Sequence, residues 1–190
     1  MHRTALRIAA ASLGLVPSIA FAHPGHEGAS LVSGFIHPLG GVDHIIAMVA
    51  VGLLAARLGG RALWLVPASF VATMAVAGLA GMAGAGLPYV EAGIALSVVV
   101  LGAVAAFGVA MPVAAAMGLV AFFAVFHGYA HGAEMPETAS GLAYGTGFVA
   151  ATALLHGIGI GLGLTIGQVG RSAVRRNAAA RSCSPDGAQA

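Results

Sequence analysis

The sequence predicts an all-α protein that crosses a membrane several times, as a polytopic bundle of transmembrane helices. Of its 190 residues, 59% are hydrophobic and only 7% are charged, and lysine does not occur. Soluble domains carry about 25% charged residues. Because so few charges cannot cover a water-facing surface, most of this surface must face lipid. Glycine is abundant, with 29 residues, and small residues let transmembrane helices approach one another closely.

Five stretches after the N-terminal segment are apolar and near the length of about 20 residues that a bilayer requires. They cover residues 33–56, 62–82, 89–108, 112–130 and 141–168. We therefore expect one transmembrane domain at residues 33–170 with five mature spans, or six hydrophobic segments counting the N-terminal one. No polar segment is long enough to form a soluble domain.

The N-terminus has the pattern of a secretory signal peptide. A short basic start precedes the apolar residues 8–16, which are too few to span a bilayer, and Ala20-Phe21-Ala22 offers the small residues that signal peptidase reads. We expect residues 1–22 to be removed. An uncleaved first helix is the alternative.

Cleavage after Ala22 exposes a histidine-rich leader at residues 23–32. The new α-amine and the His23 imidazole would chelate one metal ion, with His26 and Glu27 close by. A polar leader rich in glycine and proline, without a role in metal binding, explains the same residues equally well.

The arginines predict the orientation, because positive residues favour the cytoplasmic side of a membrane. Arg57 and Arg61 follow the first span, and four more arginines lie in residues 171–190 after the fifth. Five spans that start outside end inside, so both arginine groups fall in the cytoplasm. We expect a multi-pass protein of the bacterial inner membrane, with a periplasmic N-terminus and a disordered cytoplasmic tail at residues 171–190.

The first span contains three ionisable residues, His37, Asp43 and His44, within a short stretch. Each such residue costs about 2.5–3.5 kcal/mol on insertion scales, so their presence needs a reason. Pro38 cannot donate a backbone hydrogen bond, and Gly40-Gly41 weakens the next turn. We expect a broken or late-starting helix with Pro38 as its first residue and with Asp43 turned inward beside His44.

Broken helices recur at the binding sites of transporters. A carboxylate beside an imidazole either binds a metal ion directly or orients the imidazole. His37, Asp43 and His44 are therefore candidate metal ligands. The alternative, a polar cap at a helix end, explains His37 but hardly the other two.

A second set of candidate ligands, His127, His131 and Glu134, closes the fourth span. At about 100° per residue, the three side chains share one helical face. Imidazole suits nickel, cobalt, zinc and copper, and a carboxylate adds a harder ligand. Solvated polar residues at a helix end are the alternative. Gly128 and Gly132 leave space beside the ligands for another helix.

Two further residues are candidates for the path of a metal ion or a proton. His156 lies in the middle of the fifth span and is interpreted as a ligand, a proton acceptor or a hydrogen-bond donor between helices. Glu91 opens the third span, where a lone acid also fits a simple interaction with the helix dipole. Met48 and Met135 are interpreted as packing residues.

Several classes of function have no support in the sequence. It contains no phosphate loop, no glycine-rich nucleotide fingerprint, no basic aromatic patch and no Ser-His-Asp spacing. Cys183 is the one cysteine, so neither an internal disulfide nor a cysteine metal site is possible. We expect no enzyme activity, no permanently bound cofactor and no nucleic-acid partner; the expected partners are a divalent metal ion and the lipid bilayer.

These motifs resemble those of the HupE/UreJ family of membrane proteins. The family's first pattern, a His, five residues and then Asp-His, is matched by His37 and Asp43-His44, and its second, Phe-His-Gly-x-x-His-Gly-x-Glu, by residues 126–134. The signal peptide followed by His-Pro-Gly-His and the overall length are similar as well. Since the family is regarded as nickel, and sometimes cobalt, permeases linked to hydrogenase and urease maturation, the resemblance implies import of Ni²⁺ or Co²⁺ as transported substrate.

The residues alone leave two other classes open. A membrane-embedded metallohydrolase would hold a catalytic zinc ion and its water with the same ligands. A non-transporting subunit would bind nickel and pass it to an apoenzyme. An open coordination position beside a lipid-accessible cavity would favour the hydrolase, and metal binding without flux would favour the delivery subunit.

Overall fold

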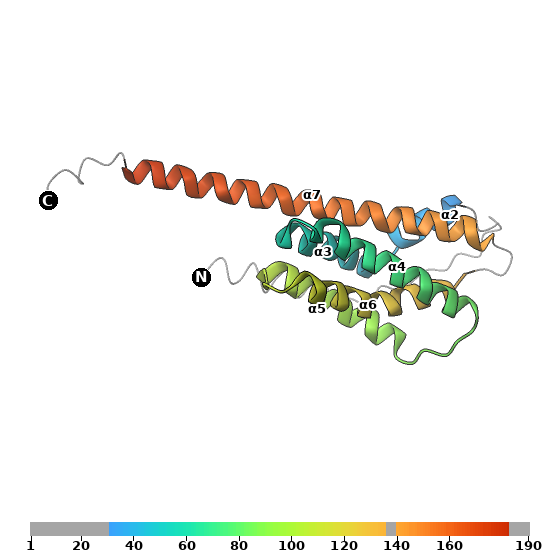
Figure 1. The fold of residues 1–190 in the computed structure, drawn as a ribbon. Coiled ribbons are helices and arrows are strands. Elements are labelled where there is room, and N and C mark those ends of the chain that lie inside the picture. Colours follow the sequence, from blue (N-terminus) through green and yellow to red (C-terminus); the bar gives the residue numbers. More distant parts are fainter. Residues whose placement is uncertain (1–30, 136–139, 183–190) are drawn as a thin grey trace.

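The computed structural model describes residues 31–135 and 140–182, and all regular structure within these ranges is helical. The elements are α2 (Leu31–Ile36), the 3₁₀ turn η2 (His37–Leu39), α3 (Val42–Leu58), α4 (Ala62–Met82), α5 (Val90–Phe107), α6 (Val113–Ala133) and α7 (Gly141–Ser182) (Figure 1). The predictions for the signal peptide, and for His23 and His26, fall outside the described residues.

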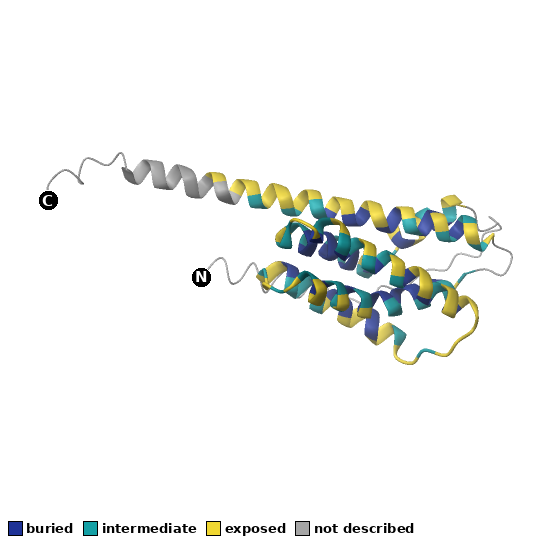
Figure 2. Ribbon diagram, viewed as in Figure 1, coloured by how far each residue is buried: buried dark blue, intermediate teal, exposed yellow. Residues whose placement is uncertain are grey.

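The helices are long and apolar enough for a protein that crosses the membrane several times. Helices α4, α5, α6 and α7 each qualify as a span, and α2 with η2 and α3 forms a fifth if the bent pair is one span. The predicted all-α transmembrane bundle is confirmed. Exposed residues cover its outside (Figure 2), including large apolar side chains such as Trp64, Val76 and Phe107. Lipid tolerates such a surface, whereas the backbone polar groups must be satisfied within helices.

The first span is broken, as Pro38 and the two following glycines predict, and its two parts meet at 86°. The helical start predicted at Pro38 is corrected in one respect: Pro38 is the second residue of η2, and α3 begins only at Val42. The reason is Gly41, whose extended backbone (φ −103°, ψ 119°) interrupts the helix. The break places Asp43 in the first turn of a new helix.

Helix α3 is the centre of the bundle, because it packs against α7, α5 and α4. Helix α4 packs most extensively against α6, and α2 lies along the start of α7 (Figure 1). Helix α7, drawn in orange to red, runs well past the other helices. It stays helical to Ser182, so the first part of the segment expected to be a disordered tail is helical.

Glycines bring the paired helices into backbone contact. A Cβ atom at Gly128 or Gly132 of α6 would collide with the backbone of Met74 or Gly78 in α4. Close approach through small residues is the usual way in which helices associate in membranes. Since Gly128 and Gly132 each follow a histidine of the second motif, this packing carries the α6 histidines into the bundle.

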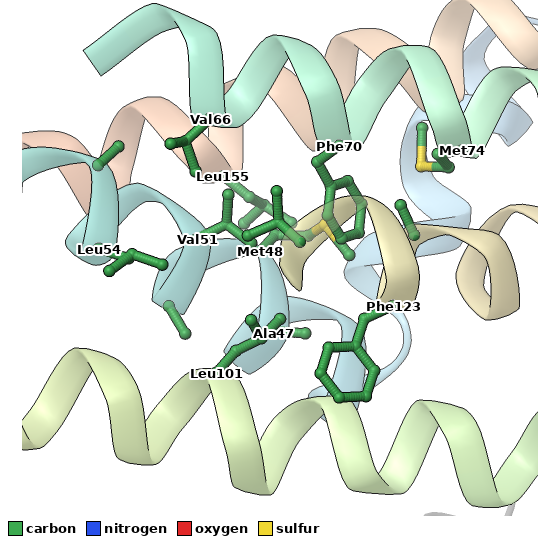
Figure 3. Packing of buried hydrophobic residues seen from close by; sticks show 14 of the residues in the cluster. Ala47, Met48, Val51, Leu54, Val66, Phe70, Met74, Leu101, Phe123 and Leu155 are labelled. Atoms are coloured by element: carbon green, nitrogen blue, oxygen red, sulfur yellow. The ribbon is translucent and has the colours of Figure 1, made fainter. Parts of the chain in front are cut away.

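The apolar core fills the middle of the bundle (Figure 3). Its largest fully buried side chains include Met48, Val51 and Leu54 of α3 and Val66 and Phe70 of α4. The histidines and carboxylates of the two sequence motifs lie towards one end of the bundle, beside this core.

Candidate metal-binding site

Both sequence motifs meet at the end of the bundle where α6 ends and α7 begins, which we call the histidine end. The first motif lies on η2 and the first turn of α3. The second lies on the last turns of α6 and its C-cap. Together they form the histidine cluster, which consists of His37, Asp43, His44, His127, His131 and Glu134. The ring centroids of neighbouring histidines in it lie between 4.3 and 4.9 Å apart.

The outermost part of the cluster has the geometry of a metal site. One ligand atom each from His37, His131 and Glu134 lies within 4.8 Å of the other two. The His37 and Glu134 side chains are exposed, and the His37 Nε2 atom lies 3.7 Å from a Glu134 oxygen. This contact with His37 lowers the pKa of the Glu134 carboxyl below its usual value and favours the carboxylate. Two imidazoles and a carboxylate suit a divalent transition metal.

Asp43 orients His44. Its Oδ1 atom accepts a hydrogen bond from the His44 backbone N–H at 2.9 Å and lies 3.2 Å from His44 Nδ1. A carboxylate only accepts hydrogen bonds, so the His44 proton belongs on Nδ1 and the lone pair on Nε2. Asp43 does pair with His44, but its own side chain stays 38% exposed while His44 is buried.

His44 and His131 meet head to head inside the bundle, with their Nε2 atoms 2.5 Å apart. Two lone pairs would repel at this distance, so one proton must lie between them. Because His44 Nε2 carries a lone pair, that proton belongs to His131. A cation that takes the place of this proton would gain two imidazole ligands from two different helices.

His127 is the most deeply buried member of the cluster, and Ser97 of α5 holds it. The Ser97 hydroxyl donates to the Ile94 carbonyl at 2.6 Å, and its oxygen lies 2.7 Å from His127 Nε2. With the hydroxyl proton already used, His127 Nε2–H donates to Ser97. His127 Nδ1 keeps its lone pair and has no hydrogen-bond partner among the described residues.

Three aromatic residues wall the cluster. The ring of Phe148 in α7 lies 4.2 Å from that of His131, Tyr144 lies 5.9 Å from His37, and Phe70 of α4 lies 5.8 Å from His127. Neither these three residues nor Ser97 is a candidate from the sequence alone. Only Ser97 has a signal there, as a lone hydroxyl within the apolar run of the third span.

The remaining predicted site residues lie elsewhere. Glu91 is exposed in the first turn of α5, and no contact joins it to the cluster in the described part of the chain. His156 is buried in α7, where its ring contacts Phe70. Met48 belongs to the apolar core and Met135 packs against it, in agreement with their interpretation as packing residues.

The fold and the site define a class: a multi-pass helical membrane protein whose buried imidazoles gather at one end of the bundle. The family model described as HupE / UreJ protein matches residues 11–184. A relative named Protein HupE, from Rhizobium leguminosarum bv. viciae, is 47% identical over 161 residues, which cover 84% of each chain. No solved structure matches the chain. The protein belongs to the HupE/UreJ family.

Proposed function

We propose that the protein is a secondary permease that imports a divalent transition metal, Ni²⁺ or Co²⁺, for the maturation of a metalloenzyme. The observation that carries this proposal is the histidine cluster itself. It begins at the exposed side chains of His37 and Glu134 and continues through His131 and His44 to the fully buried His127. Such a series of ligands leads from solvent into the bundle.

Capture takes place at the outermost part of the cluster. His37, His131 and Glu134 replace part of the ion's water shell, and the negative charge of Glu134 offsets its positive charge. Because the rings of His131 and His44 lie 4.3 Å apart and those of His44 and His127 4.7 Å apart, the ion exchanges one imidazole at a time as it moves inward. Asp43, beside His44, supplies a second negative charge.

The ligand chemistry supports transport rather than permanent storage. Permeation requires sites that bind well enough to admit an ion but not so tightly that they retain it. Nitrogen and oxygen ligands without a thiolate meet that requirement. Arg57, in the last turn of α3, and Arg61, before α4, lie at the other end of the bundle. From the positive-inside rule we expect the histidine end to face the periplasm.

Uptake of radioactive nickel and cobalt tests the proposal, in cells that lack other importers and express each variant at a matched level. The wild type is expected to show saturable uptake of at least one ion, and His44→Ala is expected to abolish it. Thr165→Val is the matched control, because it removes an exposed hydroxyl of α7 that donates to the Gly161 carbonyl of its own helix. Normal uptake by a correctly inserted His44→Ala variant would contradict the proposal.

No observation specifically favours a metallohydrolase or a metal-delivery subunit. A cavity of about 660 Å³ lies between α3, α5 and α7 and reaches Arg57, but its lining includes no member of the histidine cluster. A hydrolase would need its substrate beside the metal ligands. A metal-delivery subunit would bind the ion without moving it across a bilayer, which flux measurements decide.

A further inference from the structure

One buried imidazole of the bundle is not part of the histidine cluster. His156 of α7 is 2% exposed, and neither of its ring nitrogens has a hydrogen-bond partner among the described residues. Nearly all buried polar groups in proteins are hydrogen-bonded, so a fully buried imidazole without a partner calls for an explanation.

His156 lies further along the bundle than the cluster does. Its backbone carbonyl packs on Gly52 of α3, a contact so close that Gly52 has no room for a side chain. Gly52 follows His44 by eight residues. At 1.5 Å per residue, the His156 backbone is therefore about 12 Å beyond His44 along the axis of α3.

Phe70 contacts both the histidine cluster and His156. Its ring lies 5.8 Å from that of His127 and 5.3 Å, edge to face, from that of His156. Phe70 is fully buried and belongs to the same apolar core as Met48, Val51 and Leu155 (Figure 3). This core closes the bundle between the histidine cluster and the end that carries Arg57.

An ion that leaves His127 meets few ligands on the way across. Between the histidine cluster and Arg57 or Arg61, the described helices offer no carboxylate and no imidazole other than His156. The nearby Thr152, one turn earlier on α7, already directs its hydroxyl to the sulfur of Met74 at 3.9 Å. His156 is thus the one free nitrogen ligand within the apolar half of the described bundle.

We propose that His156 is an inner metal-binding station, separated from the histidine cluster by the ring of Phe70. This inference rests on the proposed permease function and extends it. The ion passes from His127 to His156 when the Phe70 ring moves aside, and the same ring closes the path at other times. The two unpaired nitrogens of His156 are then explained as ligand atoms that await a transition-metal cation.

The test separates binding from flux, with full-length protein in detergent and in liposomes, and with Ni²⁺ as the probe. His156→Leu is expected to bind Ni²⁺ at the histidine cluster as the wild type does, while its initial flux falls about 10-fold or more, as is usual when a metal ligand's environment is lost. Thr152→Val, a buried polar residue on the same face, is the matched control and is expected to keep normal flux. A purely structural role would lower stability and binding together, or leave flux unchanged.

A second variant tests by spectroscopy whether the ion binds at position 156. His156→Cys, made together with Cys183→Ser, places the chain's one thiol at the inner station. Thiolate is a strong ligand for cobalt, so loading with Co²⁺ is expected to produce cobalt–thiolate charge-transfer absorption. Cys183→Ser alone is the control without that band.

The outcomes distinguish this inference from the function on which it rests. A wild type that neither binds nor transports Ni²⁺ overturns the permease proposal and this one with it. A wild type that transports Ni²⁺, with an equally active His156→Leu variant and no thiolate band, overturns the inner station alone.

Discussion

Asp43 and Ser97 decide which nitrogen of each histidine faces the site. Asp43 keeps the His44 proton on Nδ1, and Ser97 accepts the His127 proton from Nε2. The lone pair of His127 Nδ1 is thereby left free, while that of His44 Nε2 accepts the His131 proton until a metal ion takes its place. Partners of this kind commonly matter almost as much as the ligands that they orient.

Asp43→Asn tests this orienting role. An amide N–H would donate to His44 Nδ1 and drive the ring proton to Nε2, where a metal ion must bind. We expect the affinity for Ni²⁺ to fall about 10- to 100-fold, the usual effect of losing such a partner. Titration calorimetry in detergent measures it, with Thr165→Val as the control; unchanged affinity would show that Asp43 has no part in the site.

Metal binding is expected to weaken in acid. An imidazole binds metal only when neutral, and free imidazole titrates near a pKa of about 6.5. Because contact with His37 lowers the pKa of Glu134, this carboxylate stays charged over that range. As the medium is acidified, protons compete with Ni²⁺ for the imidazoles but not for Glu134, so Ni²⁺ affinity should fall through the histidines alone. A Kd that is the same at about pH 7.5 and about pH 5 would contradict binding by imidazole.

How much of the site the sequence predicts differs from residue to residue. An ionisable residue within an apolar span is rare, and this local signal in the sequence identifies His37, Asp43, His44, His127 and His131. Phe70 and Phe148 have no such signal, and Ser97 has only that of a lone hydroxyl in an apolar run. Their importance depends on which helices pack together, and hydrophobic periodicity along one segment holds no information about that.

Among the elements, the spans are largely predictable and the break in the first span only in part. The second span predicted at residues 62–82 coincides with α4, Ala62–Met82. Pro38 and the two glycines predict an interruption, but the 86° bend depends on the extended backbone of Gly41. In the bent arrangement both α2 and α3 pack on α7, and the local sequence does not specify that packing.

The close pairing of α4 with α6 leads to a prediction on stability. Gly128→Ala would force a methyl group against the Met74 carbonyl and push the helices apart, at a cost of about 1–3 kcal/mol for an overpacked site. Gly118→Ala on the same helix is the control, since nothing lies within 4 Å of its added Cβ. Thermal denaturation in detergent should show a lower Tm for the first variant only. Equal Tm values would mean that the contact is not tight.

In the molecule as a whole, the arginines and the candidate metal-ligating side chains lie at opposite ends of the bundle. The histidine cluster occupies one end, Arg57 and Arg61 the other, and the apolar core around Phe70 lies between them. A path that is polar at one end and closed by apolar side chains in the middle suits a transporter that opens to one side at a time. Composition predicts the membrane bundle, whereas this polarity appears only once the helices are assembled.

Flux of Ni²⁺ into liposomes that contain only the purified protein tests the central claim most directly. The proposed permease predicts saturable entry of the ion, absent from protein-free liposomes and lost in His131→Ala, because that substitution removes the residue shared by the outer and inner parts of the cluster. Tight Ni²⁺ binding without any entry would contradict the account and would identify the protein as one that holds the metal without transporting it.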